Sequence, residues 1–300
     1  MKKIVIYIVT AIFFAVMSFD VALAHVKAKK SVKSAPAKVI QKKRVPKKKA
    51  PPLSSEEQLK KNLISKLSRM FPRDEIERIF SENRIFVDRS ILQTKPLECE
   101  LPDGTRRQYT GFFDPDCGIL VSKSLQRGKD FIEKHQEIFD RAYELYGVDA
   151  EVVAAILRIE TNFGSYLGKR SVLNALYTQY ILTASRRSMA LEQIEFFLRL
   201  AKRQEWDLFE IKGSSWGAIG LPQFMPFSYW HFAVDCNDDG KIDLFDPADA
   251  ICSAANYLRE HGWSDKAKDQ RSAIWAYNHD YTYVNAVLAY ARSLKNLINE

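Results

Sequence analysis

The spacing of apolar residues predicts a mainly helical protein. From Ser54 onward, apolar positions recur with a period of about 3.6 residues, and the alternation typical of strands is scarce. This length suits one large helical domain or two subdomains. The expected helices cover residues 55–70, 73–82, 122–146, 149–161, 171–179, 185–203, 247–261 and 279–297.

The segment from Gln93 to Leu120 departs from this pattern. Pro and Gly residues recur along it, with aromatic residues between them. Because Pro and Gly interrupt helices and favour turns, we expect a loop or short hairpin here, held by a disulfide.

The first residues have the pattern of a secretory signal peptide. Lys2 and Lys3 precede an apolar run over 4–17, and Ala22-Leu23-Ala24 gives a small-x-small cleavage site. An uncleaved membrane anchor is the alternative, but the run is shorter than the roughly 20 residues that a spanning helix needs. We therefore assign 1–24 to a signal peptide and expect an exported, periplasmic protein that is soluble after cleavage. No Cys follows the run, which disfavours a lipid anchor.

Residues 25–53 are predicted to be a disordered Lys/Pro-rich linker. The stretch to Pro52 holds 11 Lys or Arg, no acids and no aromatic residue. Subtracting these 11, Lys2 and Lys3 from 45 leaves 32 basic residues, against 36 acids once Asp20 is subtracted from 37. The folded part is therefore slightly acidic, which argues against a nucleic-acid-binding domain. The basic arm suits an anionic membrane or cell-wall polymers, or serves as a solvated spacer.

Four cysteines in an exported chain predict up to two disulfides. Of the three possible connectivities we expect the local one, Cys99 with Cys117 and Cys236 with Cys252. Zinc binding is a weaker alternative, because the chain has no C-x-x-C spacing and no His at ligand spacing from a Cys.

One carboxylate stands out in the helical pattern. Glu160 ends the apolar run "VVAAILRIE", and Ile156 and Leu157 lie one turn before it on the same face. Burial there would raise its pKa, as a general acid requires at neutral pH. The pattern alone fits equally a Glu that reaches water past Gly164, so other residues must decide.

Three strings decide it through a resemblance. They are "IETNFG" at 159–164, "GSSWGAIGLPQFMP" at 213–226, and the run from Asp235 to Tyr257 that is followed by "HGW" at 261–263. Together they resemble the membrane-bound lytic murein transglycosylase B family, over roughly Ser122 to Leu294. The resemblance implies a lysozyme-like domain over 54–300 with its catalytic core at about 122–297. A long insertion that relatives often carry after "HGW" is absent.

The resemblance also implies the reaction. Glu160 would be the single catalytic acid and base of a peptidoglycan lytic transglycosylase, which cuts the β-1,4 bond between N-acetylmuramic acid and N-acetylglucosamine and leaves a 1,6-anhydro end. Most glycosidases need two carboxylates, and these motifs contain no evident second one. The substrate-binding residues carried over by position are Ser214, Gln223, Tyr277, Asn278, Arg186 and Arg187, and we add Phe224 and Tyr283 as rings for sugar stacking. Arg186 and Arg187 fit equally well as solvated charges at a helix start.

A calcium loop is predicted after residue 234. Oxygen-bearing Asp235, Asn237 and Asp239 occupy positions 1, 3 and 5 of an EF-hand-like pattern, and the carbonyl of Lys241 follows. The loop lacks the usual final Glu. By resemblance we place Asp249, rather than Asp246, as the last ligand of a structural Ca²⁺; an Asx-rich turn without metal is the alternative. No organic cofactor is expected.

Two other functions remain open. A muramidase of the same fold would hydrolyse the same bond with water, and a non-catalytic cell-wall-binding or assembly protein would keep the groove without the chemistry. Glycan strands of peptidoglycan are the expected partner in every case.

Overall fold

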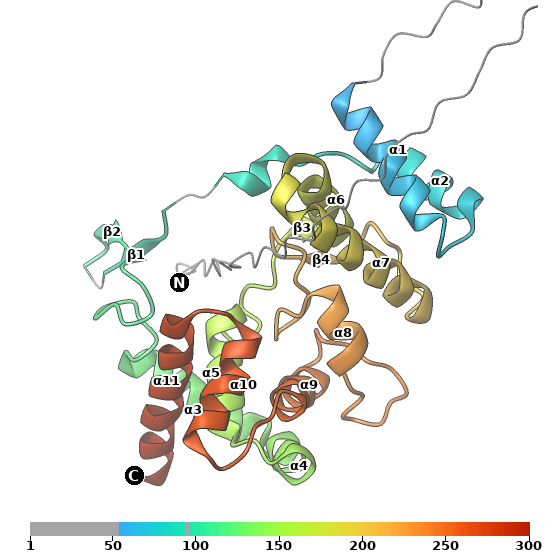
Figure 1. Ribbon diagram of the computed structural model, residues 1–300. Helices are drawn as coiled ribbons and strands as arrows, with labels where there is room; N and C mark the ends of the chain where they lie inside the picture. Colours follow the sequence, from blue (N-terminus) through green and yellow to red (C-terminus); the bar gives the residue numbers. More distant parts are fainter. Residues whose placement is uncertain (1–53, 94–95, 102) are drawn as a thin grey trace, which may run out of the picture.

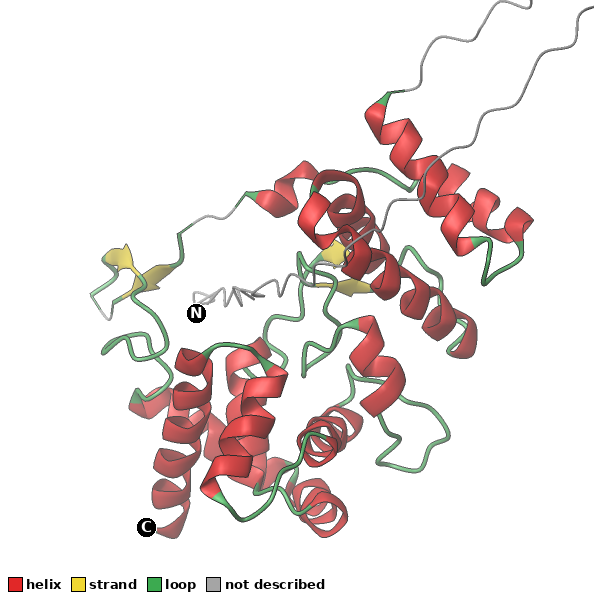
Figure 2. Cartoon of the chain, in the orientation of Figure 1, coloured by secondary structure: helices red, strands yellow, loops and turns green. Residues whose placement is uncertain are grey.

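The computed structural model describes residues 54–93, 96–101 and 103–300. The predicted signal peptide and the linker before Ser54 lie outside the described residues. Helices dominate, and the strands form two small two-stranded sheets (Figure 2), which confirms the mainly helical prediction. In the part of the chain that the structure describes, no helix has both the length and the hydropathy needed to span a membrane.

One group of elements gathers at the upper right of Figure 1. Its apolar side chains form one buried core, which includes Phe80, Tyr180 and Phe197. Helix α1 begins with a reciprocal capping box between Ser54 and Glu57. The group consists of α1 (Ser55–Leu67), α2 (Arg73–Ser81), the 3₁₀ helix η1 (Arg89–Leu92), β3 (Arg170–Ser171), α6 (Val172–Leu182), η2 (Ala184–Arg186), α7 (Arg187–Arg203), β4 (Lys212–Gly213) and α8 (Pro226–Phe232).

A second group forms the lower part of Figure 1 around another core. Its centre is α5, which contacts α3, α4, α9 and α11. All residues of α5 from Val152 to Thr161 are buried, so this helix has no solvent face along that stretch. The group consists of α3 (Ser122–Lys134), α4 (Gln136–Tyr146), α5 (Ala150–Thr161), α9 (Pro247–Glu260), α10 (Ala267–Tyr277) and α11 (Tyr281–Asn299).

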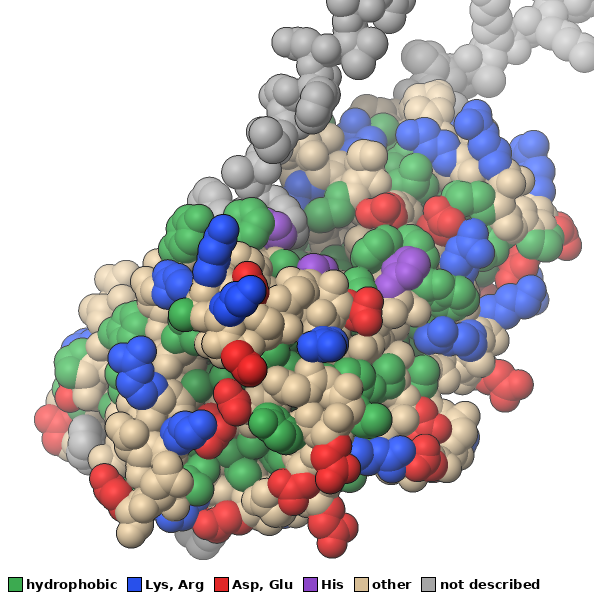
Figure 3. Space-filling model, turned by 60° about the horizontal axis from the view of Figure 1, so that its bottom comes forward, with side chains coloured by type: hydrophobic (Ala, Val, Ile, Leu, Met, Phe, Trp, Pro, Cys, Tyr) green, Lys and Arg blue, Asp and Glu red, His purple; other side chains and the backbone are tan. Residues whose placement is uncertain are grey.

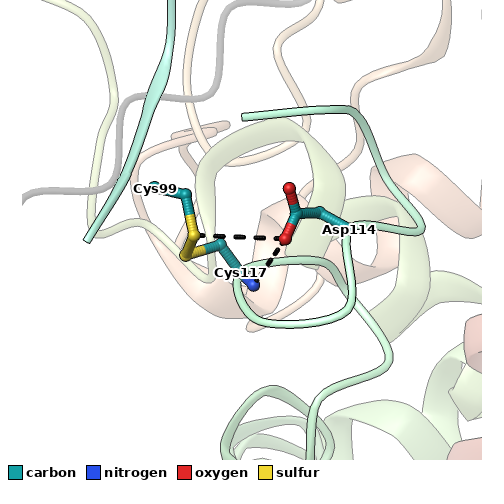
Figure 4. A group of neighbouring side chains, drawn as sticks. All are labelled: Cys99, Asp114 and Cys117. Atoms are coloured by element: carbon teal, nitrogen blue, oxygen red, sulfur yellow. Dashed lines mark hydrogen bonds between the residues drawn. A yellow bond between two sulfur atoms is a disulfide. The ribbon is translucent and has the colours of Figure 1, made fainter. Parts of the chain in front are cut away.

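The expected hairpin is present between η1 and α3. Strands β1 (Glu98–Glu100) and β2 (Arg106–Gln108) pair antiparallel, and Cys99 forms a disulfide with Cys117. Figure 4 shows Asp114 beside this bond, accepting a hydrogen bond from the Cys117 amide at 3.1 Å. Cys236 pairs with Cys252, so the predicted connectivity is confirmed.

One helix prediction was wrong and two helices were missed. The single helix expected over 122–146 is two helices, because the backbone leaves helical geometry at His135, which no Gly or Pro signals in the sequence. Helices α8 and α10 were missed. In α10 only Ala273 and Ile274 are buried, so its apolar stripe is too narrow to give a helical period.

Candidate active site

Glu160 lies in the last turn of α5 and is 6% exposed. Burial raises the pKa of its carboxyl from the ordinary 4.5 to about 8, because the charged form loses its hydration. Among the described residues, no other carboxylate contributes to this shift. The expectation of a buried acid with a raised pKa is therefore confirmed, and Glu160 does not reach water past Gly164.

Tyr283 holds this carboxyl in place. Its hydroxyl donates a 2.7 Å hydrogen bond to Oε1 of Glu160, which favours the charged form and opposes the effect of burial on the pKa of Glu160. Among the described residues, the Glu160 side chain makes this one hydrogen bond. Its other oxygen, Oε2, is therefore free to contact a ligand. Tyr283 is fully buried, which corrects its predicted role as a sugar-stacking ring. It positions the acid instead.

Two hydrogen bonds bring the distant motifs to Glu160. The hydroxyl of Thr161 donates to the carbonyl of Leu221 at 3.0 Å and accepts from the amide of Gly164. The hydroxyl of Tyr277 donates to the carbonyl of Pro222 at 2.6 Å. Sequence reasoning missed the role of Thr161, although its place directly after Glu160 in a helix end was a usable signal.

The loop from residue 213 to 226 is held by its own side chains. Ser214 accepts hydrogen bonds from the amides of Trp216 and Ala218 through its hydroxyl oxygen. The side-chain Nε2 of Gln223 donates to the carbonyl of Gly220 at 2.8 Å, and the Gln223 backbone has a φ of 51°. Gly220 has a φ of 75°, and a Cβ there would lie 2.4 Å from the Leu244 carbonyl oxygen. No larger residue fits this close approach.

Two other predicted binding residues stand at the end of α10, and a third lies in the core. Tyr277 is half-buried and Asn278 is 8% exposed at the end of α10. Phe224 is 2% exposed and packs between Tyr257 and Tyr277, with ring centroids at 5.5 and 5.8 Å. Its ring presents no face to a sugar, so the stacking prediction for Phe224 is corrected: its motif position puts it in the core.

The structure separates the two arginines. The Arg187 Nε donates to the carbonyl of Tyr180 at 2.9 Å, which fixes it against α6. The Arg186 guanidinium lies 4.1 Å from the centre of the Trp216 ring, beside a cavity of about 290 Å³, and its Nε has no hydrogen-bond partner. Of the pair, only Arg186 faces open space beside the motif loop.

The acidic loop after residue 234 carries a buried oxygen without a partner. Asp235 accepts from the Gly240 amide through Oδ2, while its Oδ1 is buried and unpaired. Both oxygens of Asp249 accept loop amides, from Cys236 and Asp243. Asp246 instead caps α9 through the amide of Ala248, so of the two acids only Asp249 points into the loop.

The remaining predicted ligands form turns within this loop. Asn237 accepts from the amide of Asp239, and Asp239 accepts from the amide of Lys241. Elsewhere, among the described residues, three potential ligand atoms converge within 4.8 Å at Cys99, Asp114 and Cys117. The two sulfurs there are joined, so this group offers no thiolate to a metal (Figure 4).

Comparison with known proteins gives a consistent family. A family model described as transglycosylase SLT domain matches residues 117–273. The membrane-bound lytic murein transglycosylase B of Escherichia coli (strain K12) is 38% identical over 163 residues, which are 54% of this chain and 43% of that protein. The chain thus matches less than half the length of this curated relative.

Solved structures share the fold. The Escherichia coli lytic transglycosylase SLT35, solved in complex with bulgecin A and also with calcium, superposes with a TM-score of 0.67 at 24% identity, covering 82% of this chain and 94% of that one. SltB3 from Pseudomonas aeruginosa, solved with NAG-anhNAM-pentapeptide, gives a TM-score of 0.67 at 22% identity, covering 81% and 80%. With its motifs assembled around Glu160 and its family model matched over more than half of its length, the chain belongs to the transglycosylase SLT domain family.

Proposed function

We propose that the protein is a peptidoglycan lytic transglycosylase that cuts the β-1,4 bond between N-acetylmuramic acid and N-acetylglucosamine. The observation that carries this proposal is the single buried carboxyl of Glu160, protonated at neutral pH and held by Tyr283. The family membership supports it, as do the relatives named lytic transglycosylases.

Glu160 performs both proton transfers. Its proton goes to the bridging oxygen as the bond to C1 of the muramic sugar breaks, which frees the N-acetylglucosamine end. The carboxylate then takes the proton of the muramic C6 hydroxyl, whose oxygen bonds to C1 and closes the 1,6-anhydro ring. Glu160 ends protonated and no water is consumed. The sugar's own acetamido oxygen stabilises the positive charge at C1 between the two steps.

The electrostatics of Glu160 support one carboxylate rather than two. Hydrolases of the usual kind place a second carboxylate about 5 to 10 Å away, as nucleophile or base. Among the described residues no second carboxylate contributes to the pKa of Glu160. Glu160 as both proton donor and base suits an intramolecular closure by the substrate.

Product analysis tests the proposal. Mass spectrometry of soluble products from purified peptidoglycan should show anhydromuropeptides with the unchanged chain, and Glu160→Gln should reduce their rate of release at least about a hundredfold. Reducing ends in place of anhydro ends would identify a muramidase. Intact glycan binding without products from either protein would identify a non-catalytic wall-binding protein.

Roles for the remaining residues follow from their placement. Ser214 and Gln223 hold the loop beside Glu160 in shape, and Tyr277 with Asn278 lines the opposite side near the glycan. Arg186 contacts acidic groups of the substrate, whereas Arg187 is structural. The protein acts after export, in the periplasm, with residues 54–300 as the enzymatic domain and the basic arm before it available to anionic surfaces.

The acidic loop binds a structural calcium ion. The unpaired buried Oδ1 of Asp235 and the inward carboxylate of Asp249 fit a hard cation that prefers oxygen ligands. The side chains of Asn237 and Asp239 and the carbonyl of Lys241 would complete the set. The related SLT35 solved in complex with calcium supports this proposal. The ion would brace the loop that leads into α9.

A matched pair of variants tests the calcium proposal. Calcium should raise the midpoint of thermal unfolding, because an ion that binds only the folded state stabilises it. Asp235→Asn keeps the bond to the Gly240 amide but loses the charge, so this increase should shrink or vanish. Asp238→Asn is the control, since Asp238 points outward to Arg141 at 2.8 Å. If calcium raised the midpoint of thermal unfolding equally in Asp235→Asn and Asp238→Asn, the proposed site would be excluded.

A further inference from the structure

A strip of aromatic rings runs along the surface beside the acid site. Its neighbouring rings approach one another closely: Phe227 and His231 lie 4.4 Å apart between centroids, Phe232 and His261 5.0 Å, and Trp275 and His279 4.1 Å. Burial lowers the pKa of His279, and the proximity of His261 adds to this effect. We call these six residues the aromatic strip: Phe227, His231, Phe232, His261, His279 and Trp275.

The strip is accessible, in contrast to the rings selected from the sequence. His231 is exposed, Trp275 is 37% exposed, and the other four rings are half-buried. Figure 3 shows histidine side chains among hydrophobic ones on one face of the molecule. Half-buried rings that are fixed by neighbours present a contact surface with little conformational freedom to lose on binding.

The strip is connected to the acid site through buried rings. His261 stacks on Tyr257 at 4.0 Å, and Tyr257 packs against Tyr277 at 4.8 Å. Tyr277 lies parallel to Tyr283, the partner of Glu160. At its other end, Phe227 lines the cavity beside Trp216. The strip therefore packs against the buried rings that hold Glu160 and also reaches the motif loop, so its exposed rings lie next to the acid site.

The strip is almost free of formal charge. Residues 227–234 and 275–279 contain no Lys, Arg, Asp or Glu, although such residues are 27% of the whole chain. Near His261 the exposed Arg259 and Glu260 offset each other. The ring nitrogens of histidine add hydrogen-bonding groups. This combination suits a neutral, hydroxyl-rich polymer with apolar ring faces and does not suit a polyanion.

We propose that the aromatic strip binds the sugar rings of a β-1,4-linked N-acetylhexosamine strand beyond the bond that is cut. The substrate class rests on the proposed function, but the binding does not require catalysis. Each exposed ring adds contact to a long strand and none to a short one.

Binding of oligomers of different length tests this proposal. In the full chain carrying Glu160→Gln, calorimetry with β-1,4-linked N-acetylglucosamine disaccharide and hexasaccharide should show tighter binding of the hexasaccharide. Adding Trp275→Ala or His231→Ala should weaken hexasaccharide binding about three- to tenfold and leave disaccharide binding unchanged. The control is Tyr143→Ala, an aromatic on α4 that is 57% exposed and lies outside the strip.

Two results would overturn the proposal. Either the strip variants bind both oligomers as tightly as the parent does, or Tyr143→Ala weakens hexasaccharide binding as much as they do. Unchanged thermal unfolding of each variant excludes a folding defect. A chain that yields no anhydro products but keeps the length dependence would refute the enzymatic proposal and retain the strip.

Discussion

At the scale of the residue, Glu160 is an ordinary carboxylic acid made unusual by its surroundings. Burial raises the pKa of Glu160, and the hydrogen bond from the Tyr283 hydroxyl partly lowers it again. The opposition of these two effects leaves the acid protonated at neutral pH and still able to act as a base. Both effects can be measured separately.

Burial of Glu160 should make stability depend on pH. Between pH 4.5 and about 8 the folded chain keeps a proton that the unfolded chain has lost. This contribution is fully present below pH 4.5 and is lost as the pH rises through 8. Glu160→Gln removes this contribution. The free energy of unfolding of the variant, relative to that of the parent, should therefore rise by roughly 1 kcal/mol per pH unit across this range. Urea unfolding at several pH values measures the difference.

The same substitution at the start of α5 is the control for this measurement. Glu151→Gln changes a half-buried carboxylate in the first turn. It removes a carboxylate from the same helix without touching Glu160 or Tyr283, and its free energy of unfolding is followed over the same pH values. A flat difference between Glu160→Gln and the parent would contradict a raised pKa for Glu160.

Removing the Tyr283 hydroxyl should affect both rate and pH profile. Without that hydrogen bond the pKa of Glu160 rises further, so the alkaline limb of the rate profile should move to higher pH. Because the carboxylate is also less well held, kcat should fall roughly ten- to a hundredfold in Tyr283→Phe. Initial rates of anhydromuropeptide release across pH 5 to 10 provide the test.

Tyr290→Phe is the matched control on the same helix. Its buried hydroxyl donates to the Ser124 carbonyl at 2.7 Å. It should leave the pH profile in place, and a parallel shift in both variants would show a general effect of α11.

At the scale of the element, the hairpin is organised around Asp114. Hydrogen bonds from the Arg107 guanidinium, at 2.6 and 2.7 Å, are the main reason that the pKa of Asp114 lies well below its usual range. Because this pKa is lower in the folded than in the unfolded chain, the charged Asp114 stabilises the fold at pH values above the unfolded-state pKa. This stabilisation is lost in strong acid. The hairpin also carries Phe112, whose ring meets Tyr283 edge-on at 6.2 Å.

Neutralising Asp114 should therefore loosen the hairpin. Asp114→Asn is expected to lower the midpoint of thermal unfolding at pH 7 by about 3 to 6 °C, and the difference should narrow in acid. Asp103→Asn, at an exposed position where the carboxylate bonds only Thr105, should change it little. Calorimetry at pH 7 and pH 3 would contradict this account if both variants melted alike.

At the scale of the whole molecule, the sequence predicted the helical class, both disulfides and the buried acid. Each of these follows from local signals: a period, a cysteine spacing, an apolar run. The burial of Phe224 and Tyr283 could not be predicted in this way, because a motif shows which residues lie close together but not which of them face the solvent. The break at His135 and helix α10 are fixed by packing against other elements, which no local pattern records.

The two cores meet at a few residues. Tyr277 packs against both, and Thr161 and Pro222 connect α5 to the motif loop that joins the two cores. The cluster that contains Glu160 therefore depends on both halves of the molecule being in place.

Helix α5, buried from Val152 to Thr161, has a consequence for how a substrate reaches Glu160. The segments of a protein that open least are those with the most buried contacts, and the acid is mounted on such a segment. A carboxyl group mounted on such a segment keeps its position while the substrate moves. For the transglycosylase proposed above, the glycan strand and not the acid would have to move between successive cuts.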